Sequence, residues 1–174
     1  MCLVIDMNTI PVIFNPQSEH HEKYKPVLDW IIHGKGKMVC GGTKYWDELQ
    51  RIGKYIRFFN QLNKAGKVVK IDDGKVDEKM KELMILCTDP DFDDPHIAAL
   101  LIVSGCKVIC TEDERSYPYI RNKCWYPKGR NIPKIYKKTS FKIASKLLID
   151  DNIAEICLPC LKLNKEQANI LTPD

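Results

Sequence analysis

Residues 93–113 read DDPHIAALLIVSGCKVICTED, and this stretch contains one example of the alternation of helices and strands from which the fold is predicted. Its first half predicts a buried helix, because Asp94 can cap it, Pro95 suits its first turn and the residues that follow are mostly apolar. Gly105 predicts the end of that helix, and residues 107–110 then predict a short buried strand. A helix followed at once by a strand is typical of chains in which the two alternate.

The same alternation extends through the N-terminal half of the chain. Short apolar runs predict three further strands, at residues 2–5, 38–40 and 67–71. Helical spacing and turn signals predict the segments between them: a helix or turn over 8–14, a loop over 17–23, and helices over 26–33, 44–62 (with Thr43 as N-cap) and 77–86. Strands that alternate with helices predict an α/β fold with a mainly parallel central sheet.

The C-terminal part of the chain gives weaker patterns. A last strand is expected over 132–136 and a helix over 139–149. Residues 153–163 fit either a strand or an interaction arm, and the polar residues 164–174 predict a loosely held tail. A length of 174 residues fits one domain.

Charge is distributed unevenly along the sequence. Residues 115–146, the basic segment, hold ten of the 27 Lys and Arg and none of the 23 Asp and Glu, so the segment carries a formal charge of +10 and the rest of the chain −6. This split excludes a uniformly basic coat protein and an acidic disordered chain. Basic side chains attract phosphates, and the aromatic residues among them can stack on unpaired bases. The basic segment therefore predicts contact with a nucleic acid. Its aromatic residues are Tyr117, Tyr119, Trp125, Tyr126, Tyr136 and Phe141.

Neither a membrane span nor a signal peptide is expected. The longest apolar run, 97–103, is far shorter than the ~20 residues that a span needs, and the N-terminus has no basic region. We therefore expect a cytoplasmic protein with no membrane partner, whose eight cysteines are mostly reduced thiols. Cys157 and Cys160 form a CxxC pair, which leaves a zinc-binding or redox-active thiol protein as an alternative.

Four acidic residues follow strands or lie on the helices after them in this scheme: Asp6, Glu48, Asp94 and Asp113. In a parallel sheet these positions come to the same edge, where ligands bind in α/β folds. Converging carboxylates repel each other unless cations neutralise them, and Mg²⁺ or Mn²⁺ suits such oxygen ligands. One or two of these ions would support phosphodiester hydrolysis. Each acid also has a structural explanation of its own, such as a helix cap for Asp94.

The motifs around these acids resemble those of the PIN domain nucleases. LVIDMN (3–8) is similar to their first strand with its Asp, GGTKYWDEL (41–49) to the helix that carries a Glu, DPHIAAL (94–100) to the helix that begins at an Asp, and VICTED (108–113) to the strand that leads into Thr-x-Asp. Met7 departs from the usual Thr or Ser, and Thr111 is expected to supply part of the missing hydroxyl's role. Because adjacent helical positions point about 100° apart, Glu48 rather than Asp47, and Asp94 rather than Asp93, should face the site.

This resemblance implies a three-layer α/β/α sandwich, with a PIN-like nuclease domain over residues 1–137 and a C-terminal helix and extension of the same domain over 138–174. It also implies a metal-dependent endoribonuclease in which the four acids hold one or two Mg²⁺ or Mn²⁺ ions and carry out catalysis. Seven further residues would bind the substrate: Asn8, Thr111, Arg115, Arg121, Lys123, Lys128 and Arg130.

The partners that the resemblance implies are nucleic acid and protein. Family members of this size are often toxins of toxin–antitoxin pairs or defence nucleases, so a homodimer and an inhibitory antitoxin are expected beside RNA. The alternatives are a nucleic-acid-binding module that has lost catalysis, and a nuclease that cuts DNA.

Overall fold

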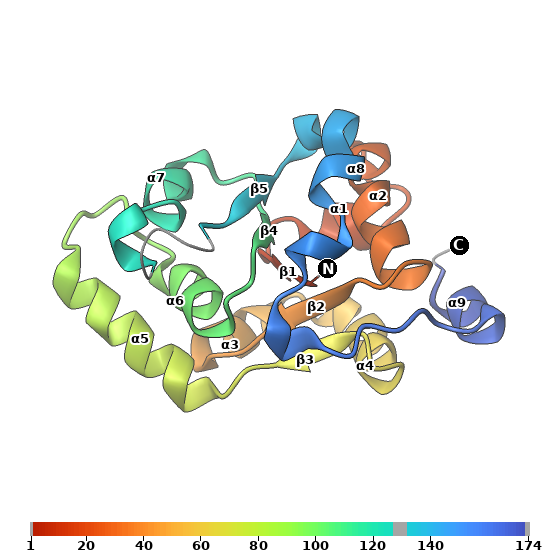
Figure 1. Ribbon diagram of the computed structural model, residues 1–174, viewed down its shortest axis with the longest axis horizontal. Coiled ribbons are helices and arrows are strands. Elements are labelled where there is room, and N and C mark those ends of the chain that lie inside the picture. Colours follow the sequence, from red (N-terminus) through yellow and green to blue (C-terminus); the bar gives the residue numbers. More distant parts are fainter. Residues whose placement is uncertain (1, 127–131, 173–174) are drawn as a thin grey trace.

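Five parallel strands form one sheet in the part of the chain that the computed structural model describes, residues 2–126 and 132–172 (Figure 1). The strand order is β3-β2-β1-β4-β5, and every neighbouring pair is parallel. The central strand β1 is buried along its whole length. The predicted α/β fold with a parallel sheet is therefore confirmed. The strands are β1 (Cys2–Ile5), β2 (Lys37–Cys40), β3 (Val68–Lys70), β4 (Val108–Cys110) and β5 (Lys134–Tyr136).

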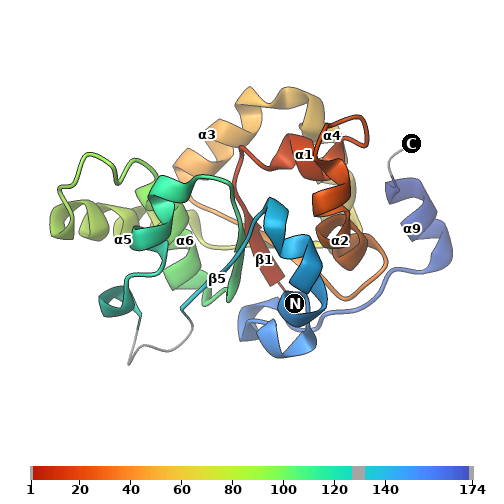
Figure 2. The ribbon, with the colours of Figure 1, turned by 90° about the horizontal axis from the view of Figure 1, so that it is seen from above.

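Helices cover both faces of this sheet (Figure 2). One face carries α1 (Ile10–Phe14), α2 (His21–Ile32), α3 (Thr43–Arg51) and α4 (Ile56–Lys64), and the other carries α5 (Asp73–Leu86), α6 (Pro95–Ser104) and α7 (Tyr117–Ile120). The apolar helix α6 packs between α5 and β1, which explains why nearly all of its residues are buried. This layering is compatible with a three-layer α/β/α sandwich.

Several helix boundaries differ from the prediction, and α5 begins at Asp73, four residues before its expected start. The helix expected over 44–62 is broken, because Ile52 leaves the helical conformation and a 3₁₀ turn (Gly53–Tyr55) separates α3 from α4. Glycine is a poor helix former, and the apolar spacing alone gave no sign of the interruption. Helix α2 begins at His21, inside the expected loop, and accommodates Pro26 in its interior.

The N-terminus of α3 is held by two carboxylates of α5. Asp73 accepts hydrogen bonds from the backbone N–H of Gly42 and the indole of Trp46, both at 2.7 Å, and Asp77 accepts from the backbone N–H of Thr43 at 2.9 Å. Negative groups are favourable at a helix N-terminus. The prediction of Thr43 as the N-cap is wrong by one residue, because Gly42 takes that position with φ +89° and Thr43 is the first helical residue.

The C-terminal part of the chain is more ordered than its sequence predicts. The expected helix over 139–149 is a 3₁₀ helix (Lys138–Ile143) followed by the short α8 (Ala144–Leu147). Residues 165–171, expected in a loose tail, form α9 (Lys165–Leu171), which begins with a capping box between Asn164 and Gln167 and packs against α4. Residues 153–163 contain no strand in the described structure and run as an arm with one 3₁₀ turn, Glu155–Cys157.

Two contacts fasten this arm to the sheet. Cys157 forms a disulfide with Cys2 of β1, whereas Cys160, the other member of the CxxC pair, and the remaining five cysteines are free. The buried Lys67 ammonium donates hydrogen bonds to the carbonyls of Gly34 (2.9 Å), Gly36 (3.3 Å) and Leu161 (3.0 Å). The arm is thus tied to the beginning of β1 and to the loops before β2 and β3.

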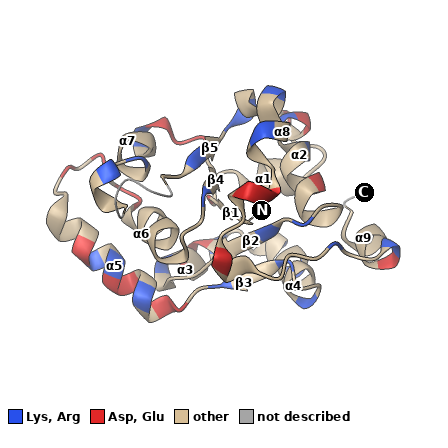
Figure 3. Cartoon of the chain, viewed as in Figure 1, with Lys and Arg blue, Asp and Glu red and all other residues tan. Residues whose placement is uncertain are grey.

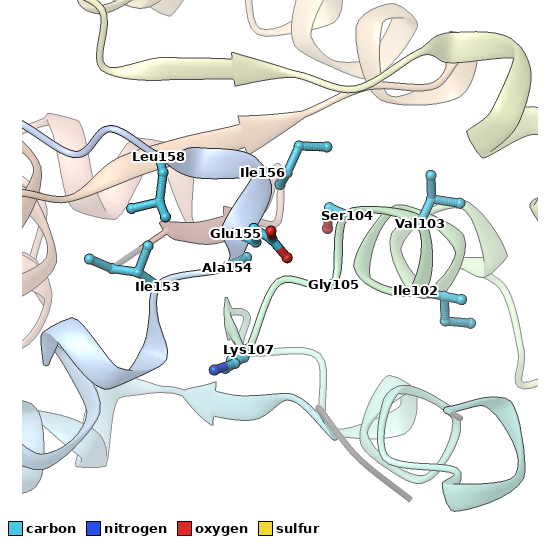
Figure 4. Close-up of a pocket in the computed structure, with 10 residues that line it drawn as sticks. All are labelled: Ile102, Val103, Ser104, Gly105, Lys107, Ile153, Ala154, Glu155, Ile156 and Leu158. Carbon is cyan, nitrogen blue, oxygen red and sulfur yellow. The ribbon is translucent and has the colours of Figure 1, made fainter. Parts of the chain in front are cut away.

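A hollow of about 750 Å³ lies between the arm and the end of α6, lined by apolar side chains together with Lys107 and Glu155 (Figure 4). It opens beside the amino end of β4, whereas the predicted site residues follow the carboxyl ends of the strands. None of those site residues lines it. Within the described residues, no helix is both long enough and apolar enough to cross a membrane.

Candidate metal centre

The predicted acidic residues lie where the parallel sheet directs them. Asp6 directly follows β1, Asp113 lies three residues beyond β4, Glu48 is on α3 and Asp94 immediately precedes α6. Strands β1 and β4 are neighbours, so the first two residues leave the sheet side by side. The structure divides these acids into two overlapping groups and one separately anchored carboxylate.

The first group consists of Glu48, Asp94 and His96, whose ligand atoms all lie within 4.8 Å of one another. The His96 ring is almost fully buried, with 2% of its side chain exposed. Its Nε2 lies 3.1 Å from Glu48 Oε2, and its Nδ1 lies 3.8 Å from Asp94 Oδ1, too far for a hydrogen bond. Nδ1 has no hydrogen-bond partner among the described residues.

The second group consists of Asp93, Asp94 and Asp113, again with ligand atoms within 4.8 Å of one another. Asp94 belongs to both groups and so joins them. It occupies the N-cap position of α6, but its side chain makes no capping hydrogen bond. The structural explanation of Asp94 as a helix cap therefore does not account for where its carboxylate points.

Asp6 is anchored beside these groups by two of the predicted substrate-binding residues. Asn8 Nδ2 donates to Asp6 Oδ2 at 2.8 Å, and Thr111 Oγ1 donates to the same oxygen at 2.6 Å. Thr111 Oγ1 also accepts from the backbone N–H of Asp113 at 3.1 Å, which links the carboxyl ends of β1 and β4. Asp6 is buried and belongs to neither group.

Two basic side chains partly neutralise this concentration of carboxylates. Lys44, one turn before Glu48 on α3, places its ammonium 3.8 Å from Glu48 Oε1 and 3.6 Å from Asp94 Oδ1. Arg115 reaches Asp93 Oδ2 at 2.9 Å and Asp113 Oδ1 at 3.2 Å. Five carboxylates thus face two basic side chains. The excess of negative charge favours the binding of further cations.

The carboxylates respond differently to this environment. Burial raises the pKa of Asp6, and the charge of Asp94 adds to the rise. Burial also raises the pKa of Asp94, against the opposing charges of His96 and Lys44. Partial burial by itself would raise the pKa of Glu48 too. The hydrogen bond and charge of His96, together with the charges of Lys44 and Arg51, outweigh burial and lower the pKa of Glu48. Raised pKa values in a cluster of acids are typical of functional sites.

Three residues of the centre were not predicted. Asp93 was excluded by a helical-direction argument that does not apply, because Asp94 is not in the helical conformation and Asp93 precedes it. Lys44 could have been found from its i, i+4 spacing to Glu48. His96 stood out as an ionisable residue in an otherwise apolar helix. Asp47, which the prediction set aside in favour of Glu48, is exposed and lies outside both groups.

The predicted substrate-binding residues are only partly brought together. Asn8, Thr111 and Arg115 contact the acidic residues, as described above. Arg121 and Lys123 are exposed at and beyond the end of α7, and neither forms an ion pair in the described structure. Lys128 and Arg130 lie outside the described residues. The Lys and Arg positions of the basic segment are spread before and after α7, over β5 and over α8 rather than gathered on one element (Figure 3).

An aromatic cluster connects the acidic centre to the basic segment. Phe92, next to Asp93, packs against Tyr119 with ring centroids 4.8 Å apart and against Trp125 at 5.1 Å. All three rings are half-buried, so each keeps some exposed surface. The cluster holds the loop before α6 against the start of the basic segment.

Comparison of the chain with protein-family models, with curated proteins and with solved structures found no match. The resemblance to PIN domain nucleases therefore stays a prediction that rests on the four motifs. The alternative of a cysteine-bound zinc ion gains no support, because neither of the two candidate ligand groups in the described residues contains a cysteine.

Proposed function

We propose that this chain is a PIN-like, metal-dependent nuclease that hydrolyses phosphodiester bonds of RNA. One observation carries the proposal: Asp94 belongs to two candidate ligand groups at once, at the edge of a parallel sheet where α/β proteins bind their ligands. A site with five carboxylates and two bases retains net negative charge, and a purely structural role would not require that charge to be gathered in one place.

The donor set fits a divalent cation. Carboxylate oxygens are the ligands of Mg²⁺ and Mn²⁺, and the buried Nδ1 of His96 is a donor that the described protein leaves without a partner. Asp94 and His96, with Glu48 beside them, would hold one ion, and Asp93, Asp94 and Asp113 a second. When bound, such a cation offsets the charge of a phosphate and lowers the pKa of the water that attacks it.

The remaining residues of the centre would bind and orient the substrate. Lys44 and Arg115 already lie beside the carboxylates, so a phosphate held there would meet two positive side chains. The planar guanidinium of Arg115 can bind two phosphate oxygens at once. Asp6, fixed by Thr111 and Asn8, would keep a buried negative charge behind the ligand groups.

Single-stranded RNA is the substrate that the surroundings favour. The basic segment begins two residues after Asp113 and supplies attraction for the backbone. The exposed parts of Phe92, Tyr119 and Trp125 offer ring surfaces on which unpaired bases can stack.

The proposal is tested by incubating the purified protein with labelled single-stranded RNA in Mn²⁺, in Mg²⁺ and in EDTA. We expect cleavage with metal and none with EDTA, and we expect Asp94→Asn to abolish it because that change removes a ligand from both groups. The matched control is Asp47→Asn, an exposed carboxylate outside both groups, which should cut at the wild-type rate. RNA that is bound but never cut in either metal would instead support a non-catalytic binding module.

A further inference from the structure

The His96 ring is almost fully buried, and one of its two nitrogens has no partner among the described residues. The other residues of α6 have no ionisable side chain, and the two ring nitrogens of His96 lie 3.1 Å from Glu48 Oε2 and 3.8 Å from Asp94 Oδ1. Its Nε2 has a partner in Glu48, but Nδ1 is buried and unpartnered in the described structure. Buried polar groups without a partner are rare in proteins, because desolvation costs free energy that no contact returns. An unpartnered nitrogen that faces a carboxylate therefore points to a ligand that both would share.

We infer that His96 is a nitrogen ligand of the cation site and that this site prefers a divalent first-row transition metal, such as Mn²⁺, to Mg²⁺. The inference rests on the metal site of the proposed function and adds the identity of the metal to it. Imidazole nitrogen binds transition metals well, whereas Mg²⁺ prefers oxygen ligands alone.

The contacts of the ring assign the nitrogen that would bind. If Nε2 carries the proton, it donates to Glu48 Oε2 at 3.1 Å, and the lone pair of Nδ1 is left toward Asp94 Oδ1. A metal-bound histidine in proteins commonly donates its other ring N–H to a carboxylate, which fixes the ring and its tautomer. Glu48 is already in position to do this for His96.

Binding of Mn²⁺ and Mg²⁺ to the metal-free full-length chain, measured by calorimetry without RNA, tests the inference. We expect the wild-type chain to bind Mn²⁺ at least about tenfold more tightly than Mg²⁺. His96→Gln should lose about tenfold in Mn²⁺ affinity and little in Mg²⁺ affinity, because its amide can still donate to Glu48 but no longer presents an imidazole nitrogen. The matched control is His33→Gln, an exposed histidine at the end of α2, which should leave both affinities unchanged.

Pulsed electron paramagnetic resonance of Mn²⁺ bound to the wild-type chain provides a second readout that needs no variant to fold. A ¹⁴N coupling from a directly bound imidazole is expected, and it should vanish in His96→Gln. Absence of that coupling in the wild type, or equal affinity for the two metals, would overturn the inference. These outcomes are separate from RNA cleavage: a chain that binds Mn²⁺ through His96 but cuts no RNA would refute only the proposed function.

Discussion

At the scale of single residues, the metal centre contains some side chains that could be predicted from the sequence and others that could not. Asp6, Glu48, Asp94 and Asp113 could be predicted because each follows a strand of a simple alternating pattern, or begins or lies on one of its helices. Asp93 could not, because its direction depends on the non-helical backbone of Asp94. The pairing of Nε2 with Glu48, and the lack of a partner for Nδ1, could not be predicted either, since they depend on how α3 and α6 pack.

The buried carboxylate of Asp6 should lower the free energy of unfolding at neutral pH, although the proposed function uses its charge. Burial raises its pKa, so the native state disfavours the ionised form, and ionisation of Asp6 lowers the free energy of unfolding as pH rises above the usual carboxyl range. Asp6→Asn should therefore be more stable than wild type at pH 7 in the absence of metal, with a gap that closes toward pH 3.8. Urea unfolding of both proteins across this pH range measures the gap. A variant less stable than wild type at pH 7 would contradict this explanation.

Arg115 should compete with a cation for Asp93 and Asp113. Arg115→Ala removes the positive charge that pairs with both carboxylates, so Mn²⁺ affinity should rise a few-fold at low ionic strength, whereas RNA affinity should fall. Calorimetry with Mn²⁺ and RNA titrations measure the two effects separately. Arg57→Ala, an exposed arginine on α4, serves as the control and should leave Mn²⁺ affinity unchanged. Reduced Mn²⁺ affinity in Arg115→Ala would show that Arg115 supports the site rather than competing for it.

At the scale of elements, the position of Glu48 depends on how α3 is held. Its N-terminus has no side-chain cap of its own, and Asp73 and Asp77 of α5 supply the acceptors instead. The spacing of apolar residues predicted the existence of α3. It could not predict the break at Ile52, nor the hydrogen-bond acceptors that α5 supplies to the N-terminus of α3. Periodicity reports which face of a helix is buried, and it does not report contacts between elements far apart in sequence.

Loss of the cap from α5 should weaken both the fold and the metal site. Asp77→Ala leaves the Thr43 backbone N–H without its acceptor and should lower the free energy of unfolding by about 1 kcal/mol. Mn²⁺ affinity should fall as well, since α3 carries Glu48. Urea unfolding and metal titration test the two effects, with Glu78→Gln on the same helix as control. Unchanged stability would mean that water replaces the cap at no cost.

At the scale of the whole molecule, the C-terminal arm completes a fold whose sheet could be predicted almost strand for strand. The sheet was predictable because short apolar runs alternate with helices, whereas the arm is held by single long-range contacts that leave no local pattern. The disulfide joins residues 155 positions apart, and Lys67 reaches carbonyls from three separate positions. Such contacts arise from the finished fold. The prediction of a loose tail was wrong for another reason, because α9 begins with a capping box between Asn164 and Gln167, a local signal that the polar composition of the tail concealed.

The buried Lys67 should give the stability a distinct pH dependence. Burial lowers the pKa of its ammonium from 10.5 to about 8, so between these values the unfolded chain binds a proton that the native chain has lost. Relative to Lys67→Met, the wild-type chain should gain stability from pH 8 to 10.5, by up to about 3 kcal/mol. Urea unfolding at a series of pH values measures this difference, and the exposed Lys64→Met should run parallel to wild type. Parallel curves for Lys67→Met would refute the assignment.

The proposed function requires a catalytic cation at the carboxyl edge of the sheet, and anomalous diffraction can locate that cation. Crystals grown with Mn²⁺ should give a strong peak at the manganese absorption edge between Glu48, Asp94 and His96, and a second peak by Asp93 and Asp113 if two ions bind. The same crystals of Asp94→Asn should lose these peaks. Crystals of the wild-type chain with no peak at this edge of the sheet, at a Mn²⁺ concentration that supports RNA cleavage, would contradict the account.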